Sequence, residues 1–421
     1  MLLYNPKVSE HIDFLKKYLD VTVTHSLKEF NNFQGKKLFV VTILDIWLAN
    51  NTNTNTTSID WTTVFDKTLL DNLYTYKVLF DISYESCTTS TEDTILDLCH
   101  QASLDPSNVY ISVPNTVSAR LPKLQKFNIF SVERYEHDAV QVGFSMGESL
   151  SKFRFKENRR FLFINRRYSL DRAYLYFKFH QNNLLNDMHC TFRLDKIYAD
   201  DQVNINEVIA NLGLVYDDTS LTHYVLDNEI TITSLPHTIN TDLYKTDYKK
   251  SFLYTFWNIA AHNSTDINII SETYGHHYES MGFNHYKTLY FITEKTYRTI
   301  LLKQPFIIFS NPYALKYLKE SGYKSFSPFI NESYDNIENL VDRQQAIVTE
   351  VTRLKNMPKN EFEELLGNCK TIALHNHNNL MNRIQDKYHN TYWSTDDIKP
   401  YLRGIDTSLT LSIVAKWYNK Y

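Results

Sequence analysis

The sequence predicts an α/β protein of two domains, each built around a parallel sheet. The chain has 421 residues, which is more than one hydrophobic core usually supports. Short β-rich apolar runs alternate with helical or polar stretches, a rhythm typical of parallel α/β sheets. The runs fall into two series, separated by the polar, basic stretch Gly147–Arg159. We therefore expect a first domain at residues 1–150 and a second at residues 151–385.

Each expected strand is a short apolar run. The first series comprises Leu38–Thr42, Val78–Ile82, Val109–Val113 and Phe127–Val132. The second series comprises Phe161–Ile164, Ile267–Ile270 and Phe306–Phe309. From about Glu361 the pattern is helical, and Leu409–Tyr421 reads as a helix. We expect residues 386–421 to form a helical segment that crosses back to the first domain.

Composition and charge narrow the classes of function. The chain is 43% hydrophobic and 22% charged, without an apolar stretch that would span a membrane or a secretory signal, so a cytoplasmic location is expected. A net charge of −4 argues against a general affinity for nucleic acid. Only 9 glycines stand against 30 tyrosines and 25 phenylalanines, which with the abundant Asn and Lys suggests an AT-rich genome. Such a genome could be that of a virus, a phage or an AT-rich bacterium, and for a viral protein the expected location is the host cytoplasm.

The cysteines do not indicate a metal or disulfide framework. They are scattered without a C-x-x-C pair, at Cys87, Cys99, Cys190 and Cys369. The His276-His277-x-Glu279 cluster, with His285 nearby, lacks regular ligand spacing. We expect no bound metal.

The sharpest local motif runs from Thr293 to Arg298 and precedes the strand Phe306–Phe309. Thr293 is a plausible N-cap, which places Glu294 and Lys295 in the first helical turn, where backbone N–H groups and the helix dipole favour an anion. Lys295 would bind a pyrophosphate, and the Glu294 carboxylate would accept hydrogen bonds from two ribose hydroxyls. The competing interpretation is that Glu294 and Arg298 form a surface i,i+4 ion pair.

Two further strand ends carry charged residues. The strand Phe161–Ile164 runs into Asn165-Arg166-Arg167-Tyr168-Ser169-Leu170-Asp171-Arg172, an arginine cluster suited to phosphate. A solvated basic turn explains the same pattern equally well. Glu272 follows the strand Ile267–Ile270, although a lone Glu in a loop is more often exposed to solvent. Ligands of α/β domains bind where these strands end.

A structural helix is expected after the strand Phe306–Phe309. Asn311 would cap it, Pro312 would take its first position, and Gly322 would close it. Leu315 and Leu318 would face inward. The strand and this helix together form one Rossmann-type unit.

The order of these motifs resembles a known enzyme family. Ile269-Ile270-Ser271-Glu272-Thr273, a spacer, Thr293-Glu294-Lys295-x-x-Arg298 and a Pro-led strand resemble the donor-site motif of the α1,3-fucosyltransferase family. Residues Thr293–Phe326 resemble a group of phage and bacterial glycosyltransferase-like proteins still more. The resemblance spans Phe161–Asn336. It departs from the fucosyltransferase pattern at Thr299–Gln304, so it does not carry fucose over as the donor sugar.

The resemblance implies a GT-B-type fold, in which two Rossmann-like domains face a central cleft. It implies a glycosyltransferase that moves a sugar from a nucleotide-diphosphate sugar to a hydroxyl acceptor: a glycan, a small molecule or a modified DNA base. Glu294 would hold the ribose and Lys295 the phosphates, and Glu272 would face the donor sugar. Arg172, with Arg166 as a second candidate, would hold the pyrophosphate. The segment beginning at Asn165 resembles the family's Asn…Arg element. Arg and Lys make a metal unnecessary.

The catalytic base stays open at this point. An inverting enzyme needs a carboxylate to deprotonate the acceptor. Candidates at strand ends of the first domain are Asp45, Asp81 and Glu85.

Two alternatives to a general glycosyltransferase also remain. One is a phage enzyme that glycosylates a hydroxymethylated DNA base, with Lys152–Arg172 and its interleaved Phe153, Phe155 and Phe161 meeting the nucleic acid. The other is an inactive binding or virion-associated protein with the same fold.

Overall fold

The computed structural model describes residues 2–4, 22–34, 37–42, 46, 60–82, 89–114, 122–132, 135–136, 157–165, 169–191, 219–227, 259–272 and 292–389. The chain divides by its contacts into two compact units. The first unit comprises Met1–Arg134, Tyr278–Leu289 and Arg383–Tyr421, and the second comprises Tyr135–His277 and Tyr290–Asn382. Most of the boundary expected at 147–159, and most of the segment 386–421, lies outside the described residues.

The first unit contains a six-stranded parallel sheet. Its strand order is β2-β1-β3-β4-β5-β6. The strands are β1 (Leu2–Tyr4), β2 (Thr22–Thr24), β3 (Lys37–Thr42), β4 (Lys77–Asp81), β5 (Val109–Pro114) and β6 (Asn128–Val132). The helices are α2 (Leu27–Asn32), α4 (Lys67–Asn72) and α5 (Thr89–Gln101), with one-turn 3-10 helices at Trp61–Thr63, Leu73–Thr75, Pro106–Asn108 and Pro122–Leu124.

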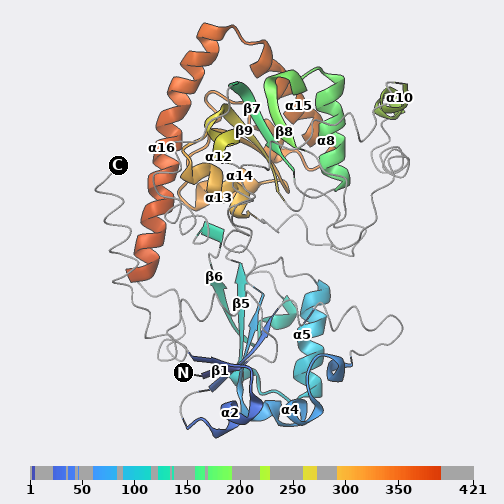
Figure 1. Cartoon of the computed structure of the whole chain (residues 1–421), viewed down its shortest axis with the longest axis vertical. Helices are drawn as coiled ribbons and strands as arrows, with labels where there is room; N and C mark the ends of the chain where they lie inside the picture. The colour runs from blue at the N-terminus through green and yellow to red at the C-terminus, as the bar shows by residue number, and fades with distance from the viewer. Residues whose placement is uncertain are drawn as a thin grey trace. The chain divides into compact units, whose positions relative to one another are not determined.

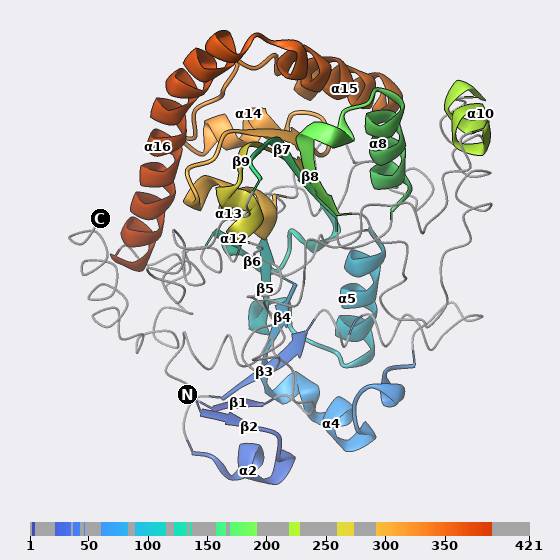
Figure 2. The ribbon, with the colours of Figure 1, turned by 45° about the horizontal axis from the view of Figure 1, so that its top comes forward.

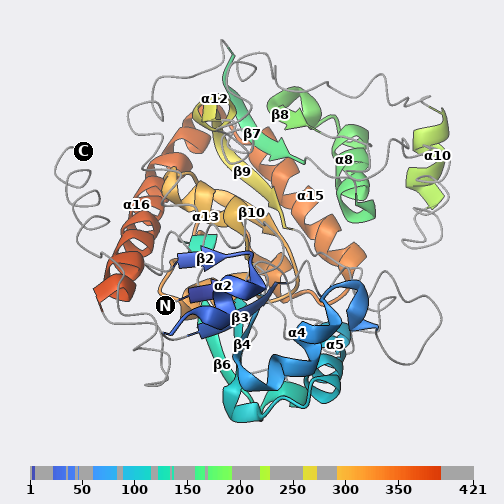
Figure 3. The same cartoon turned by 60° about the horizontal axis from the view of Figure 1, so that its bottom comes forward.

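One face of this sheet packs against helices. Successive side chains of a strand alternate between faces. Val78, Phe80 and Ile82 therefore point the same way, and they share a buried core with Leu69 of α4 and Ile95 of α5. Figure 3 shows α4 and α5 together beside the strands. The apolar runs of the first series thus form a sheet because their alternate residues are buried against these helices.

The second unit contains a four-stranded parallel sheet with the order β10-β9-β7-β8. Its strands are β7 (Arg159–Ile164), β8 (Met188–Thr191), β9 (Thr265–Ser271) and β10 (Phe306–Phe309). The helices are α8 (Leu170–Gln181), α10 (Thr219–Asp227), α12 (Ile259–Asn263), α13 (Glu294–Leu301), α14 (Ala314–Glu320), α15 (Leu340–Asn356) and α16 (Lys359–His389), with 3-10 helices at Leu185–Asp187 and Ser333–Asn336. The α/β class predicted from the sequence is confirmed, and both sheets are parallel.

Helices cover both faces of the second sheet. From β7 the chain passes through α8 to β8, at one edge of the sheet. From β9 it passes through α13 to β10, at the opposite edge. Because such crossovers are right-handed, opposite directions place α8 and α13 on opposite faces. Figures 1 and 2 show α8 and α15 on one side of the sheet, with α13 and α16 on the other. His377 of α16 lies 2.9 Å from the carbonyl of Leu301, which ties α16 to α13.

The two sheets share a strand order. Numbered within its own unit, each runs 2-1-3-4 over its first four described strands, and the first sheet continues with two more. This is the order of doubly wound, flavodoxin-like sheets. In such sheets strand 2 is added on one side of strand 1 and strand 3 on the other, so the direction of strand addition reverses between strands 1 and 3. The crevice at this reversal, beyond the carboxyl ends of the strands, is where such sheets bind ligands. In the second unit the reversal lies between β7 and β9.

The helix after β10 begins later than the sequence predicts. Asn311 and Pro312 do not open it, because Tyr313 takes a left-handed backbone with φ 69° and α14 starts at Ala314. The Asp335 carboxylate supplies the cap and accepts hydrogen bonds from the backbone N–H groups of Leu315 at 3.0 Å and Lys316 at 3.3 Å. Sequence spacing did not reveal a cap from a residue so far along the chain.

The end of α14 agrees with the prediction. Gly322 has φ 86°, and its N–H donates to the carbonyl of Lys319 while that of Tyr323 donates to Leu318. These two bonds form a Schellman motif. A Cβ at Gly322 would also lie 2.9 Å from the side-chain oxygen of Asn379 on α16. Glycine is therefore required here both for the turn and for the approach of α16.

Candidate functional site

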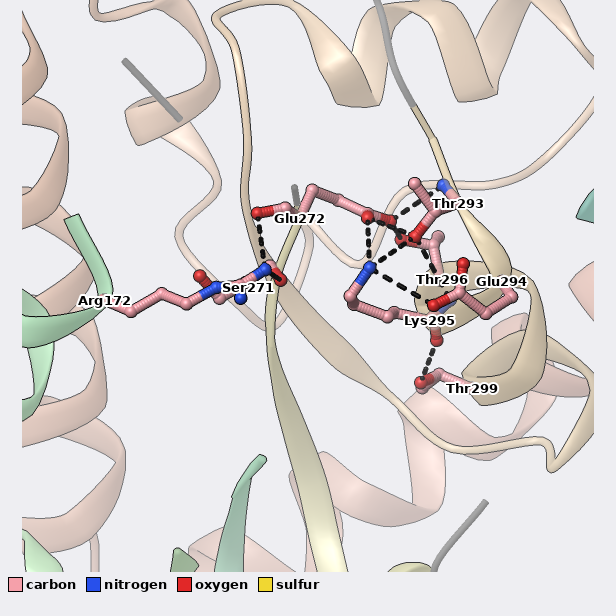
Figure 4. A network of polar contacts seen from close by, with 8 residues as sticks. All are labelled: Arg172, Ser271, Glu272, Thr293, Glu294, Lys295, Thr296 and Thr299. Carbon is pink, nitrogen blue, oxygen red and sulfur yellow. Dashed lines mark hydrogen bonds and ion pairs between the residues drawn. The ribbon is translucent and has the colours of Figure 1, made fainter. Parts of the chain in front are cut away.

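A buried carboxylate, Glu272, lies at the carboxyl end of β9 and organises the start of α13. Its side chain is 0% exposed. Oε1 accepts hydrogen bonds from the backbone N–H of Thr293 at 3.0 Å and from the hydroxyl of Thr296 at 2.6 Å. Oε2 accepts the hydroxyl of Thr293 at 2.5 Å. Figure 4 shows this network. An exposed Glu272 was the more common expectation for a lone Glu in a loop. The structure buries it, because three donors from Thr293 and Thr296 satisfy the charge.

Lys295 extends from the first turn of α13 into the same network. Thr293 caps the helix as predicted, accepting from the backbone N–H of Lys295. The Lys295 ammonium donates to the Thr293 hydroxyl at 2.9 Å. It also lies 3.6 Å from Oε2 of Glu272 and 3.2 Å from Oε1 of Glu294. With 23% of its side chain exposed, Lys295 connects the buried carboxylate to the surface.

Glu294 is the partly exposed partner in this network, at 31%. Burial alone would raise its pKa, but the charges of Lys295 and Arg298 and a hydrogen bond from Lys295 together hold the pKa below the ordinary value. Arg298 is only 6% exposed. Burial lowers the pKa of Arg298, while the charges of Glu294 and Glu272 oppose this shift. A surface Glu294–Arg298 pair is therefore wrong, because the Arg298 side chain is buried.

Arg172 connects the two strands at the reversal of the second sheet. It is a buried first-turn residue of α8, and its Nη2 donates to the carbonyls of Ser271 at 3.3 Å and Glu272 at 3.2 Å. The start of the helix after β7 is thus joined to the end of β9. Asn165, at the end of β7, is also buried at this edge. Arg172, Glu272 and Lys295, predicted from separate motifs, meet around one strand end.

Several predicted site residues lie elsewhere or outside the description. Arg166, Asp45, Glu85 and the cluster at 276–285 are outside the described residues. Asp81 ends β4 in the first unit, where it is 3% exposed and accepts a 2.7 Å hydrogen bond from Ser112. Over the described part of the chain, no group of three His, Cys, Asp or Glu side chains is placed to hold a metal ion.

No family model, curated protein or solved structure matches this sequence. The described helices include none that is both long and apolar enough to cross a membrane.

Sequence reasoning missed the residues that connect α13 to β9. Thr296 and Thr299 are both buried, as is Asn268 in the middle of β9. The side chain of Asn268 donates to the Thr299 hydroxyl at 2.7 Å. The spacing T-x-x-T-x-x-T from Thr293 to Thr299 was a usable signal, because residues three apart share a helix face.

A second group of polar contacts joins His262 of α12, Thr265 of β9 and Gln304, which follows α13. The side-chain nitrogen of Gln304 donates to the carbonyl and the hydroxyl of Thr265, at 3.1 and 3.0 Å, so its oxygen faces Nδ1 of His262 at 2.7 Å. Nδ1 must therefore carry the proton. Burial, together with the charge of Arg298, lowers the pKa of His262 to about 3. His262 is thus neutral in the folded protein.

Because His262 is buried in its neutral form, we expect the folded protein to lose stability in acid. Its ordinary pKa is 6.5, so the unfolded chain binds a proton that the folded chain rejects. The stability is complete above about pH 6.5 and falls as the pH drops toward 3, by about 1.4 kcal/mol per pH unit from this one residue. Denaturant unfolding at pH 7, 6 and 5 measures the slope. In His262→Gln the slope should flatten, whereas His100→Gln, a change at an exposed position of α5, should leave it at the wild-type value. Equal slopes in all three proteins would contradict the burial of a neutral His262.

Proposed function

We propose that this protein is a metal-independent glycosyltransferase that moves a sugar from a nucleotide-diphosphate sugar to a hydroxyl acceptor. The observation that carries the proposal is a partly exposed ion pair, Lys295 and Glu294, whose ammonium also lies 3.6 Å from the buried carboxylate of Glu272. The three residues lie at a strand end next to the reversal of a doubly wound sheet. Doubly wound sheets bind nucleotides at such reversals. Opposite charges on adjacent first-turn residues suit a ligand that carries both phosphates and a ribose diol.

The chemistry divides between these two side chains. Breaking the bond between the sugar and the diphosphate builds negative charge on the departing diphosphate, and a fixed cation stabilises that charge. Lys295 supplies the cation. The Glu294 carboxylate has two acceptor oxygens and suits the two adjacent ribose hydroxyls. The helix start contributes a positive dipole end to the same place.

The existing ion pair sets a condition on binding. The Lys295 ammonium lies 3.2 Å from Oε1 of Glu294. A bound donor takes over both partners, with phosphate on Lys295 and ribose on Glu294, so neither charge is left bare. Glu272 accepts three hydrogen bonds from Thr293 and Thr296, which keep it in place while the exposed pair rearranges.

The remaining features of the proposal concern the whole enzyme. A GT-B-type arrangement requires two Rossmann-like domains, and the presence of two parallel α/β units supports it. Asp45, Asp81 and Glu85 remain the candidate bases, and the enclosure of Asp81 beside Ser112 argues for Asp45 or Glu85 first. For a DNA acceptor the support is smaller, because Phe161 is buried in β7 and cannot stack on a base.

A ligand panel tests the proposal. Uridine, guanosine, adenosine and cytidine diphosphates and their common sugar conjugates are added to the protein, and thermal unfolding is followed. A diphosphate at 100 times its Kd stabilises the folded state by about 2.7 kcal/mol, a clear rise in Tm. Release of nucleoside diphosphate from the matching sugar donor then measures turnover. Binding without turnover on any acceptor would favour an inactive binding protein, and no binding at all would remove the proposal.

Chelation forms the second arm of the same experiment. Because Lys295 supplies the cation, EDTA should leave both the Tm rise and the turnover unchanged. Loss of turnover in EDTA with recovery on added manganese or magnesium would show that a metal performs the role given to Lys295.

A further inference from the structure

We infer that a stripe of three buried threonines, at the N-cap and along α13, positions the donor-binding residues. The essential contact is the hydrogen bond between Thr299 of this stripe and Asn268 of β9. This inference rests on the proposed function of Lys295 and Glu294. Thr293, Thr296 and Thr299 lie three residues apart on the face of α13 that meets β9. All three hydroxyls bond to side chains of that strand or of the residue that ends it.

The stripe attaches the helix to the strand at two separated points. Glu272 holds the first turn through Thr293 and Thr296, and Asn268 holds the next turn through Thr299. Asn268, Ile270 and Glu272 alternate along β9, so they share the face that meets α13. One contact alone would let the helix rotate or slide along the sheet. Two contacts, four residues apart on the strand, fix both movements.

Thr299 also transmits this position to Lys295. Its hydroxyl accepts from Asn268 at 2.7 Å and donates to the backbone carbonyl of Lys295 at 2.9 Å. One hydroxyl therefore uses its donor and its acceptor in a chain that runs from mid-strand to the backbone of the proposed phosphate-binding residue. Both Asn268 and Thr299 are buried, so water does not replace either bond.

The polar stripe accounts for an odd feature of α13. Threonine is a mediocre helix former, and a helix of eight residues has little stability of its own. Two threonines within so short a helix, beside a third at its N-cap, therefore indicate that attachment to β9 outweighs propensity. Positioning to within a fraction of an ångström matters for transfer reactions, since a displacement of about 1 Å can lower the rate about a hundredfold.

Thr299→Val tests the inference, because valine keeps the shape and removes the hydroxyl. The matched control is Thr352→Val on α15, whose hydroxyl makes the same bond to the carbonyl four residues earlier, 2.8 Å from Val348. Amide hydrogen exchange is measured for all variants without ligand. Thr299→Val should speed exchange across Thr296–Leu301 by about tenfold, whereas Thr352→Val should leave α13 unchanged. Thr299→Ser should restore wild-type exchange.

Binding completes the test, with whichever nucleoside diphosphate stabilises the wild type most. Thr299→Val should raise its Kd by about tenfold, and Thr299→Ser should return most of the affinity. An unchanged exchange rate over α13, or an affinity equal to that of Thr352→Val, would overturn the positioning role. Failure of the wild type to bind any diphosphate would instead overturn the proposed function, before any variant is compared.

Discussion

Lys295→Ala should lower both turnover and donor affinity. The ammonium contacts the diphosphate, whose charge grows as the sugar leaves, so its loss is felt more strongly in the transition state than in the ground state. Removing one charge-assisted contact of this kind costs roughly 1.5–3 kcal/mol, which corresponds to a tenfold to hundredfold loss of kcat/KM. Steady-state kinetics with varied donor concentration measures both parameters. We expect kcat to fall and donor KM to rise together.

Glu294→Ala is the paired measurement, because its carboxylate contacts the ribose, where no bond changes. It should mainly raise donor KM and leave kcat closer to the wild-type value. The substitution also frees Lys295 from a carboxylate 3.2 Å away, so the cation remains available to phosphate. Wild-type kinetics in both variants would remove the donor site from α13.

The second large effect is expected at Glu272. In Glu272→Ala the N–H of Thr293 and the hydroxyls of Thr293 and Thr296 lose their acceptor in a buried place. Breaking a buried, charge-bearing network by removing one member costs about 3–5 kcal/mol. We expect the free energy of unfolding in urea to fall by that amount. Lys295 also loses its nearest buried charge, so diphosphate affinity should change as well.

Glu272→Gln separates charge from shape. The amide oxygen still accepts from the backbone of Thr293, and the fold should survive with a smaller loss of stability. The amide nitrogen then faces the Lys295 ammonium, which has lost its attraction to Oε2. Glu364→Gln, at an exposed position of α16, is the control and should behave as wild type. A Glu272→Ala protein as stable as that control would refute the organising role of Glu272.

Local sequence patterns predicted much of the fold. All seven predicted strands are present, and β10 has the predicted bounds Phe306–Phe309. Buried parallel strands are continuous apolar runs and therefore stand out in a sequence. Three strands were missed, namely β1, β2 and β8, which have only three or four residues each. A four-residue run stands out when all of its residues are apolar, as in β10, whereas β2 and β8 include polar residues and β1 has only three residues. Pairing with neighbouring strands stabilises these three strands instead.

The candidate site was predictable only in part. The cap at Thr293 and the first-turn positions of Glu294 and Lys295 follow from sequence alone, because they depend on neighbours within a few residues. The burial of Glu272 and Arg298 does not, because their partners come from other elements. A carboxylate in a loop is expected to be exposed to solvent unless its hydrogen-bond donors are known. The contacts of Arg172, 99 and 100 residues away in sequence, likewise have no local signal.

The separation between Arg172 and β9 has a consequence for how the protein is made. Strand β7, helix α8 and strand β8 lie within Arg159–Thr191, so their contacts form across short stretches of chain. The central pairing of β7 with β9 joins Arg159 to Thr265 and must wait for a much longer loop to close. A ribosome synthesises the chain from its N-terminus, at about 5–20 residues per second, so α8 emerges several seconds before the strand to which Arg172 binds. During that interval the edge of β7 is open, and a chaperone that shields this edge would protect the protein from aggregation.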